Sequence, residues 1–345
     1  MERIGEARNM LENKAISEKR TVNENSLSGP PLDTLLSSML SSRNEYVGRL
    51  APSPTGALHL GNVRTFMIAW LRARSLGGRI VLRMEDLDHP RDKPGADVLA
   101  RKDLEWLGFD WDEEAVQSRR KHLYAARLGQ LLAKNLIYPC VCSRRDVEAA
   151  QGAPHAGEQL KYPGTCRNRN ISWEEAEKIH SPCWRFKVDD GDSSVSFEDA
   201  FAGRYSMDVA KTLGDFPLAR DKGGAGYTLA VVVDDADMGI TEVVRGDDLL
   251  PATPAQILVA RALGLEPPAY CHVPLVVGPD GKRLAKRHGD TRIASFREAG
   301  ISPRKIIGML AASCGWCEED TEISLAELVP LFSIDTIPHS PFVVK

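Results

Sequence analysis

The chain has 345 residues, of which 43% are hydrophobic and 27% charged, and its formal net charge is −4. This composition is typical of a globular protein and excludes a membrane-spanning class, because no apolar run reaches the ~18 residues that a transmembrane helix needs. The seven cysteines are too sparse, and odd in number, for a secreted disulfide scaffold. We therefore expect a cytoplasmic monomer with no signal peptide and no membrane partner.

The first stretch with a clear structural pattern follows a polar N-terminal extension. Residues 1–44 are rich in Ser, Asn and Glu, which predicts a disordered segment. Residues 46–50 favour a strand, Pro and Gly within 52–56 interrupt it, and apolar residues at helical spacing then predict a helix from about Leu60. Bare backbone N–H groups at such a helix start attract phosphate, and His59 stands where it can donate a hydrogen bond to a phosphate oxygen.

The remaining pattern alternates strands and helices around one interruption. Residues 79–84 suit a buried parallel strand that delivers Glu85 to the edge where doubly wound sheets bind ligands. Ser172 and Glu175 form a capping-box pattern. Further strands are predicted over residues 136–142, 184–188, 195–197, 216–220, 227–233, 240–244 and 272–277, and helices over 94–107, 117–135, 249–263, 302–313 and 324–331.

These elements predict an α/β fold with a doubly wound, mostly parallel sheet. We expect its two halves over residues 45–137 and 213–290, separated by a Cys-rich insertion over 138–212. A short helical tail over residues 291–345 completes the expected division.

The basic loop after the last predicted strand carries a second candidate for phosphate binding. Residues 283–287 read Arg-Leu-Ala-Lys-Arg, and the ammonium of Lys286 can stabilise charge that develops on a phosphate during transfer. Residues 59–62, read alone, would fit an ordinary βα turn with one exposed histidine. Residues 59–62 and 283–287, taken together with the run of residues 49–56, resemble the signatures of class I aminoacyl-tRNA synthetases of the glutamyl and glutaminyl branch.

This resemblance implies a Rossmann-like catalytic domain that takes ATP, Mg²⁺ and L-glutamate. It implies that His59, Asn62 and Lys286 are catalytic and that these three residues and Gly61 bind ATP. The residues that it places around glutamate are Arg49, Ala51, Ser53, Glu85, Tyr227 and Arg245. Arginine suits this role because the guanidinium group presents paired donors to a carboxylate. Two simpler interpretations remain open: Tyr227 could belong to the core, and Glu85 could form a buried ion pair with Arg245.

The insertion contains a candidate metal site. Cys140, Cys142 and Cys166 offer three thiolates, and structural zinc is commonly held by four ligands of this kind. His155 is the chemically more ordinary fourth ligand, whereas the family resemblance implies Tyr162. We expect one structural Zn²⁺ on Cys140, Cys142, Tyr162 and Cys166, with buried free thiols as the alternative.

The nature of the RNA acceptor is suggested by two departures from the full-length glutamyl enzymes. Val231 stands where those enzymes usually carry an Asn, and only residues 288–345 follow the lysine loop. Both features resemble a truncated branch of the family, which implies a tail over residues 291–345 with no anticodon-binding domain. It also implies transfer of glutamate to queuosine in the anticodon stem-loop of tRNA(Asp). The basic segment 282–305 would then steer the RNA phosphates. The alternatives are a shortened enzyme that charges the 3′ end of tRNA(Glu) and a catalytically idle module that binds RNA or nucleotide.

Overall fold

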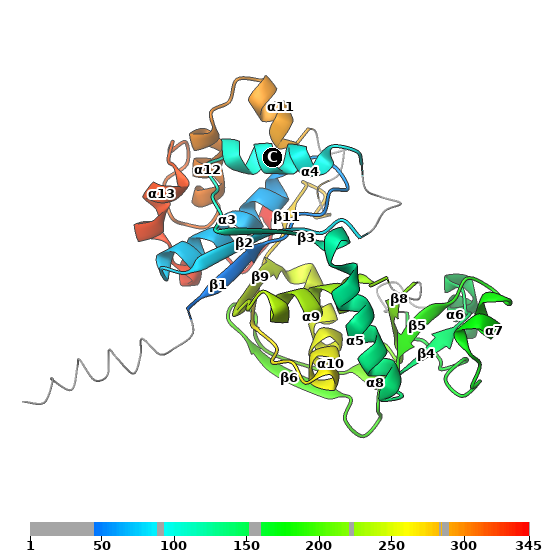
Figure 1. Ribbon diagram of the computed structural model, residues 1–345. Coiled ribbons are helices and arrows are strands. Elements are labelled where there is room, and N and C mark those ends of the chain that lie inside the picture. Colours follow the sequence, from blue (N-terminus) through cyan, green and yellow to red (C-terminus); the bar gives the residue numbers. More distant parts are fainter. Residues whose placement is uncertain are drawn as a thin grey trace, which may run out of the picture. The chain divides into compact units, whose positions relative to one another are not determined.

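A parallel βαβ unit opens the described part of the chain (Figure 1). The computed structural model describes residues 45–87, 93–151, 160–220, 224–282, 284 and 290–344. Strands β1 (Val47–Leu50) and β2 (Arg79–Met84) pair in parallel around helix α3 (Leu60–Ser75), as the sequence predicts. A third parallel strand, β3 (Glu113–Val116), joins β2 and was not predicted.

The second half of the doubly wound fold lies against β1. Strands β9 (Glu242–Gly246) and β10 (Ala269–Val273) pair in parallel, and β6 (Ser194–Asp199) adds to β10. The Thr241 amide donates to the Val47 carbonyl at 2.9 Å, which links the segment before β9 to β1. The prediction of parallel strands with their carboxyl ends at a common edge is therefore confirmed.

The interruption forms an antiparallel unit. Strands β4 (Ile137–Cys140), β5 (Cys183–Phe186) and β8 (Phe216–Ala219) pair side by side, close to the predicted ranges. The capping box of Ser172 and Glu175 opens a short helix as predicted. The remaining elements here are α6 (Arg144–Gln151), α7 (Trp173–Glu177), α8 (Val209–Thr212) and β7 (Gly203–Asp208), the last paired antiparallel to β6.

The strand predicted over residues 227–233 is wrong, because these residues form helix α9 (Tyr227–Asp237). A run of buried Val, Leu and Ala fits a helix buried on all sides as well as a buried strand, so its periodicity does not separate the two. Asp234 and Asp235 extend the element beyond strand length and are themselves buried. Charged partners from other elements stabilise the helix at that end.

Prolines divide two other predicted elements. The strand predicted over 272–277 is split into β10 and β11 (Val276–Val277), because Pro274 has no N–H to donate to a sheet. The helix predicted over 249–263 begins as the 3₁₀ turn η2 (Asp247–Ala252), which contains Pro251, and continues as α10 (Thr253–Leu263). The helix predicted over 117–135 is also in two parts, although no proline divides it: a 3₁₀ turn, η1 (Gln117–Arg120), is followed by α5 (Lys121–Ala133).

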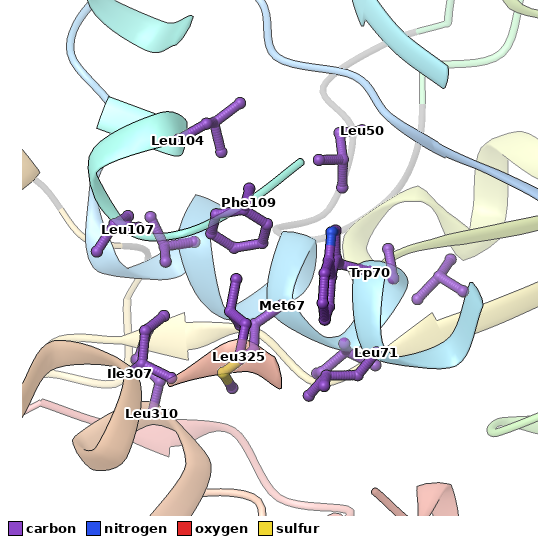
Figure 2. Packing of buried hydrophobic residues seen from close by; sticks show 14 of the residues in the cluster. Leu50, Met67, Trp70, Leu71, Leu104, Leu107, Phe109, Ile307, Leu310 and Leu325 are labelled. Atoms are coloured by element: carbon purple, nitrogen blue, oxygen red, sulfur yellow. The ribbon is translucent and has the colours of Figure 1, made fainter. Parts of the chain in front are cut away.

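The C-terminal tail packs on the first βαβ unit rather than projecting from it. Figure 2 shows Met67, Trp70 and Leu71 of α3 surrounded by side chains of α4 (Ala96–Trp106) and its end, α12 (Pro303–Ala312) and α13 (Leu325–Leu328). The tail also contains α11 (Ile293–Glu298), η4 (Val329–Leu331), η5 (Ile334–Thr336) and β12 (Phe342–Val343), which pairs with β11. In the described ranges, no helix is both long enough and apolar enough to cross a bilayer.

Candidate active site

The six residues expected around glutamate lie on segments that meet at one edge of the parallel strands. Arg49 belongs to β1, Glu85 follows β2, and Arg245 belongs to β9. Tyr227 begins α9, and its hydroxyl lies 3.5 Å from the Arg245 Nη1. Ala51 and Ser53 flank Pro52, whose carbonyl accepts a hydrogen bond from the Glu85 amide at 3.0 Å.

Both simpler interpretations of these residues are wrong. Tyr227 is 43% exposed, so it is not a core side chain. Desolvation raises the pKa of its hydroxyl, while the neighbouring charge of Arg245 lowers it. Glu85 pairs with Arg83 and not with Arg245, at 3.1 Å between Arg83 Nη2 and Glu85 Oε1. Burial raises the pKa of Glu85 although Arg83 and Arg49 act in the opposite direction.

Arg83 and Asp235 organise this edge and were missed in the sequence. The fully buried Arg83 donates from Nη1 to Asp235 Oδ1 at 2.6 Å and from Nη2 to Glu85. The same Asp235 oxygen lies 3.9 Å from Arg49 Nε, and Arg49 Nη1 donates to the Val244 carbonyl at 2.8 Å. One signal was available: Arg83 interrupts an apolar strand two residues before Glu85, a spacing that places both on one face.

Arg245 is held by a second set of buried groups. Its Nε donates to His272 Nε2 at 2.9 Å, and its Nη2 donates to Thr253 Oγ1 and Gln256 Oε1, both at 2.8 Å. All four residues are buried. His272 and its neighbours carry no motif that would mark them in the sequence.

The start of α3 differs from the expectation of bare N–H groups. His59 is the N-cap, and its Nδ1 accepts from the Gly61 and Asn62 amides at 3.1 and 3.4 Å. The Asn62 side chain accepts in return from the His59 amide at 3.2 Å. The Leu60 amide donates to the Thr291 carbonyl, and the Val63 amide donates to the His59 carbonyl. The expectation of bare N–H groups at this helix start is therefore wrong. Because Nδ1 accepts, the proton of neutral His59 belongs on Nε2.

A pocket of about 740 Å³ opens beside His59. Its lining comes from the turn before α3, from the start of α4, from the basic loop and from the segment after it, and includes Gly56, His59, Lys93, Leu284, Asp290 and Arg292. The Ile293 amide donates to the Leu58 carbonyl at 2.9 Å, which holds the last segment against the first. Lys286 lies outside the described residues, while Leu284 and Asp290, on either side of it in the chain, both line this pocket.

The insertion brings its candidate metal ligands together. The sulfur atoms of Cys140, Cys142 and Cys166 lie within 4.8 Å of one another, close enough to hold a metal ion. The Tyr162 hydroxyl lies 3.3 Å from the Cys140 sulfur and 3.7 Å from that of Cys142. His155 falls outside the described residues, so its position is not compared with that of Tyr162.

These distances fit a tetrahedral site. With Zn–S bonds of about 2.3 Å, two ligand sulfurs of a tetrahedron stand about 3.8 Å apart. The Cys142 and Cys166 sulfurs are 3.6 Å apart. Arg185 supplies positive charge, since its Nε lies 3.1 Å from the Cys140 sulfur and its guanidinium carbon 3.8 Å from the centre of the Tyr162 ring. A cation beside three thiolates offsets their negative charge.

Comparison with known proteins gives one consistent relationship. Residues 45–334 match the family described as tRNA synthetases class I (E and Q), catalytic domain. The chain is 45% identical to a protein of Symbiobacterium thermophilum named glutamyl-Q tRNA(Asp) synthetase, over 85% of this chain and 94% of the relative. It is 46% identical to a protein of the same name in Rhodopirellula baltica, over 81% and 88%.

A solved structure gives the same relationship at the level of the fold. The glutamate tRNA ligase of Elizabethkingia meningosepticum, solved in complex with its amino acid, superposes with a TM-score of 0.74 at 29% identity. The match covers 88% of this chain and 67% of that protein.

Proposed function

The chain belongs to the class I tRNA synthetases of the glutamate and glutamine type, and on that premise we propose that it activates L-glutamate with ATP and transfers the glutamyl group to queuosine in the anticodon of tRNA(Asp). The observation that carries the activation step is the meeting of Arg49, Glu85, Tyr227 and Arg245 at the sheet edge. The acceptor follows the name of the two relatives, of which this chain matches 94% and 88%.

In the activation step, an α-carboxylate oxygen of glutamate attacks the α-phosphorus of ATP, and the bond to pyrophosphate breaks. No protein nucleophile is needed, so the residues act by positioning and by stabilising charge. Arg245 and Tyr227 would bind a glutamate carboxylate, Glu85 would accept from the ammonium group, and Arg49 would add positive charge. Ala51 and Ser53 would line the glutamate site with their backbone, next to Glu85.

At the nucleotide end, His59 would donate from Nε2 to a phosphate oxygen while its Nδ1 remains on the helix cap. Asn62 and Gly61 hold that imidazole in place, and Lys286 would stabilise the charge on the departing pyrophosphate. Mg²⁺ bound with ATP would neutralise further phosphate charge.

We assign the Cys group a structural Zn²⁺ with Tyr162 as the fourth ligand. The support is the 3.6 Å spacing of the Cys142 and Cys166 sulfurs and the approach of the Tyr162 hydroxyl to two thiols. Such an ion would join β4 to the loop that carries Cys166. It would thereby order the insertion without taking part in activation.

Two measurements test the proposed function in sequence. ATP–pyrophosphate exchange that depends on glutamate and needs no RNA is expected first; absence of exchange even when tRNA is added would leave only a binding module. Radiolabelled glutamate is then offered to tRNA(Asp) with and without queuosine and to tRNA(Glu), each with and without prior periodate treatment. Labelling of tRNA(Asp) only when it carries queuosine is expected. Labelling of tRNA(Glu) at its 3′ end, independent of queuosine, would instead identify a shortened glutamyl-tRNA synthetase.

A further inference from the structure

The guanidinium group of Arg245 has most of its donors occupied by protein atoms. Of its five N–H bonds, the one on Nε donates to His272 and the two on Nη2 donate to Thr253 and Gln256. Within the described part of the chain, only the two N–H bonds of Nη1 remain, and the Tyr227 hydroxyl lies 3.5 Å from that nitrogen. A carboxylate that binds here therefore meets Nη1 beside Tyr227, and not a free two-nitrogen fork.

The contact between Arg245 and His272 requires one particular tautomer of the imidazole. Nε2 must carry a lone pair, since Arg245 Nε can only donate. The proton must then be on Nδ1, which lies 2.6 Å from Asp199 Oδ2. Thr253 Oγ1 also approaches Nε2, at 3.1 Å, and can donate to it or to the Leu249 carbonyl. A proton on Nε2 would instead face the Arg245 N–H.

Asp199 is itself held in one orientation. Its Oδ1 accepts from three backbone amides, those of Phe201 at 3.0 Å, Ala202 at 2.8 Å and His272 at 3.0 Å. These bonds leave Oδ2 to face His272 Nδ1. They also keep the carboxylate ionised: burial raises the pKa of Asp199, but the bonds from His272 and the backbone lower it by more. Burial lowers the pKa of His272, which favours a neutral ring with a single proton.

We propose that Asp199 and His272 are positioning residues that fix the orientation of Arg245 and so determine how tightly glutamate binds. This proposal rests on the proposed function, in which Arg245 binds a glutamate carboxylate. The three residues lie on neighbouring strands, Asp199 at the end of β6, His272 on β10 and Arg245 on β9. Strand β6 thus reaches Arg245 through the buried His272.

The variant Asp199→Asn tests the tautomer directly. Three amides hold the oxygen of the new side chain at the Oδ1 position, so its NH₂ group must face His272 Nδ1. The imidazole proton then moves to Nε2 and opposes Arg245. We therefore expect the KM for glutamate to rise by about 10- to 100-fold, which is the usual effect of losing a hydrogen bond to a charged group. The KM for ATP should change by less than about threefold, because ATP is placed at the other end of the site.

A second substitution distinguishes a positioning role of Asp199 from a merely structural one. Glutamine at residue 272 can present an amide oxygen to Arg245 whatever stands at residue 199. The double variant D199N/H272Q should therefore bind glutamate better than D199N, with a KM close to that of H272Q alone. A merely structural role predicts the opposite, since two buried substitutions would add their damage. Asp208→Asn is the matched control: it lies on the same hairpin, pairs with Ser193 and Lys211, and should leave both KM values unchanged.

The same chemistry has a spectroscopic signature that does not depend on activity. Nitrogen-15 NMR of histidine-labelled protein, with His272 assigned by its loss in H272Q, should show the Nδ1–H form in the natural protein and the Nε2–H form in D199N. If D199N does not fold, the natural protein still decides the matter, because an Nε2–H form there overturns the proposal. An unchanged glutamate KM in folded D199N also overturns it. Absence of glutamate-dependent exchange in the natural protein would instead overturn the proposed function and leave the tautomer assignment standing.

Discussion

The two ends of the candidate site hold their charged groups in opposite ways. At the glutamate end, Arg83 is fully buried and bonded to two carboxylates that follow it by 2 and 152 residues in the chain. At the nucleotide end, the Arg292 side chain is 60% exposed and pairs with Asp290, two residues away. The buried Arg83 thus combines a neighbouring carboxylate with one from a distant segment, whereas the exposed Arg292 pairs with a carboxylate near it in the chain.

This difference has an energetic reason. A buried guanidinium group is costly to desolvate, so it persists only where several partners fix its geometry. Exposed pairs contribute little and orient their side chains only weakly. The end that we propose binds glutamate therefore has its charged groups fixed by the fold, whereas the end that we propose binds nucleotide presents an open pocket of about 740 Å³ whose charges remain in solvent.

The largest effect should come from breaking the buried network. Arg83→Met removes the cation bonded to Asp235 and Glu85 and leaves both buried carboxylates with only the more distant Arg49, so we expect the free energy of unfolding to fall by about 3–5 kcal/mol. Urea unfolding followed by circular dichroism measures it. Arg292→Met is the matched variant at the exposed end, where no measurable change is expected. Equal losses in the two variants would contradict the contrast between the two ends.

The next largest effect should fall on catalysis at the nucleotide end. Lys286→Ala removes the charge expected to meet the phosphates and should slow activation on the order of 10²- to 10³-fold. Glutamate affinity should stay nearly unchanged. Single-turnover formation of the adenylate measures the first quantity, and equilibrium binding of glutamate measures the second. Lys282→Ala, in the same basic segment, is the control; a rate for Lys286→Ala equal to that of the natural protein would exclude the assigned role.

Arg245→Leu should separate the two substrates. It removes the charged donor to the carboxylate, so the KM for glutamate should rise by about 10- to 100-fold while that for ATP changes little. Exchange kinetics with each substrate varied in turn provide the comparison. Arg101→Leu removes a partly exposed guanidinium elsewhere and serves as control. An equal loss for both substrates would indicate misfolding.

His59→Asn should weaken the nucleotide end without weakening the helix. Asparagine is among the preferred N-cap residues, so the melting temperature of the protein should be unchanged. The Nε2 donor is lost, and the KM for ATP should rise by about tenfold. Gly61→Ala offers an independent test, because its added Cβ would lie 3.0 Å from the His59 Cε1 and press on the ring. Unchanged ATP kinetics in both variants would show that the imidazole does not meet the nucleotide.

The smallest effect on activation should follow loss of the metal. Protein purified without chelator should contain one zinc per chain, and Cys142→Ser should release it while glutamate-dependent exchange changes by less than about threefold at low temperature. Elemental analysis gives the metal content. Cys317→Ser, a cysteine of the tail, is the control. Folded protein that contains no zinc would favour three buried free thiols.

Several features followed from the sequence alone because each depends on residues close together in the chain. The start of α3 at Leu60, the capping box at Ser172 and the βαβ unit are of this kind. The Cys140, Cys142 and Cys166 sulfurs also come together as expected, on the evidence of their residue type and of the family resemblance. Local propensity, capping and side-chain periodicity determine such features before any long-range contact forms.

The tertiary structure alone decided which partners the charged residues have. An apolar run such as residues 227–233 is compatible with a strand or a buried helix, and only packing selected α9. Asp235 for Arg83, and His272 with Asp199 for Arg245, come from segments far apart in the chain, and no spacing rule connects them. Burial made those partners necessary, since a charge removed from water must be bonded wherever the fold provides a partner.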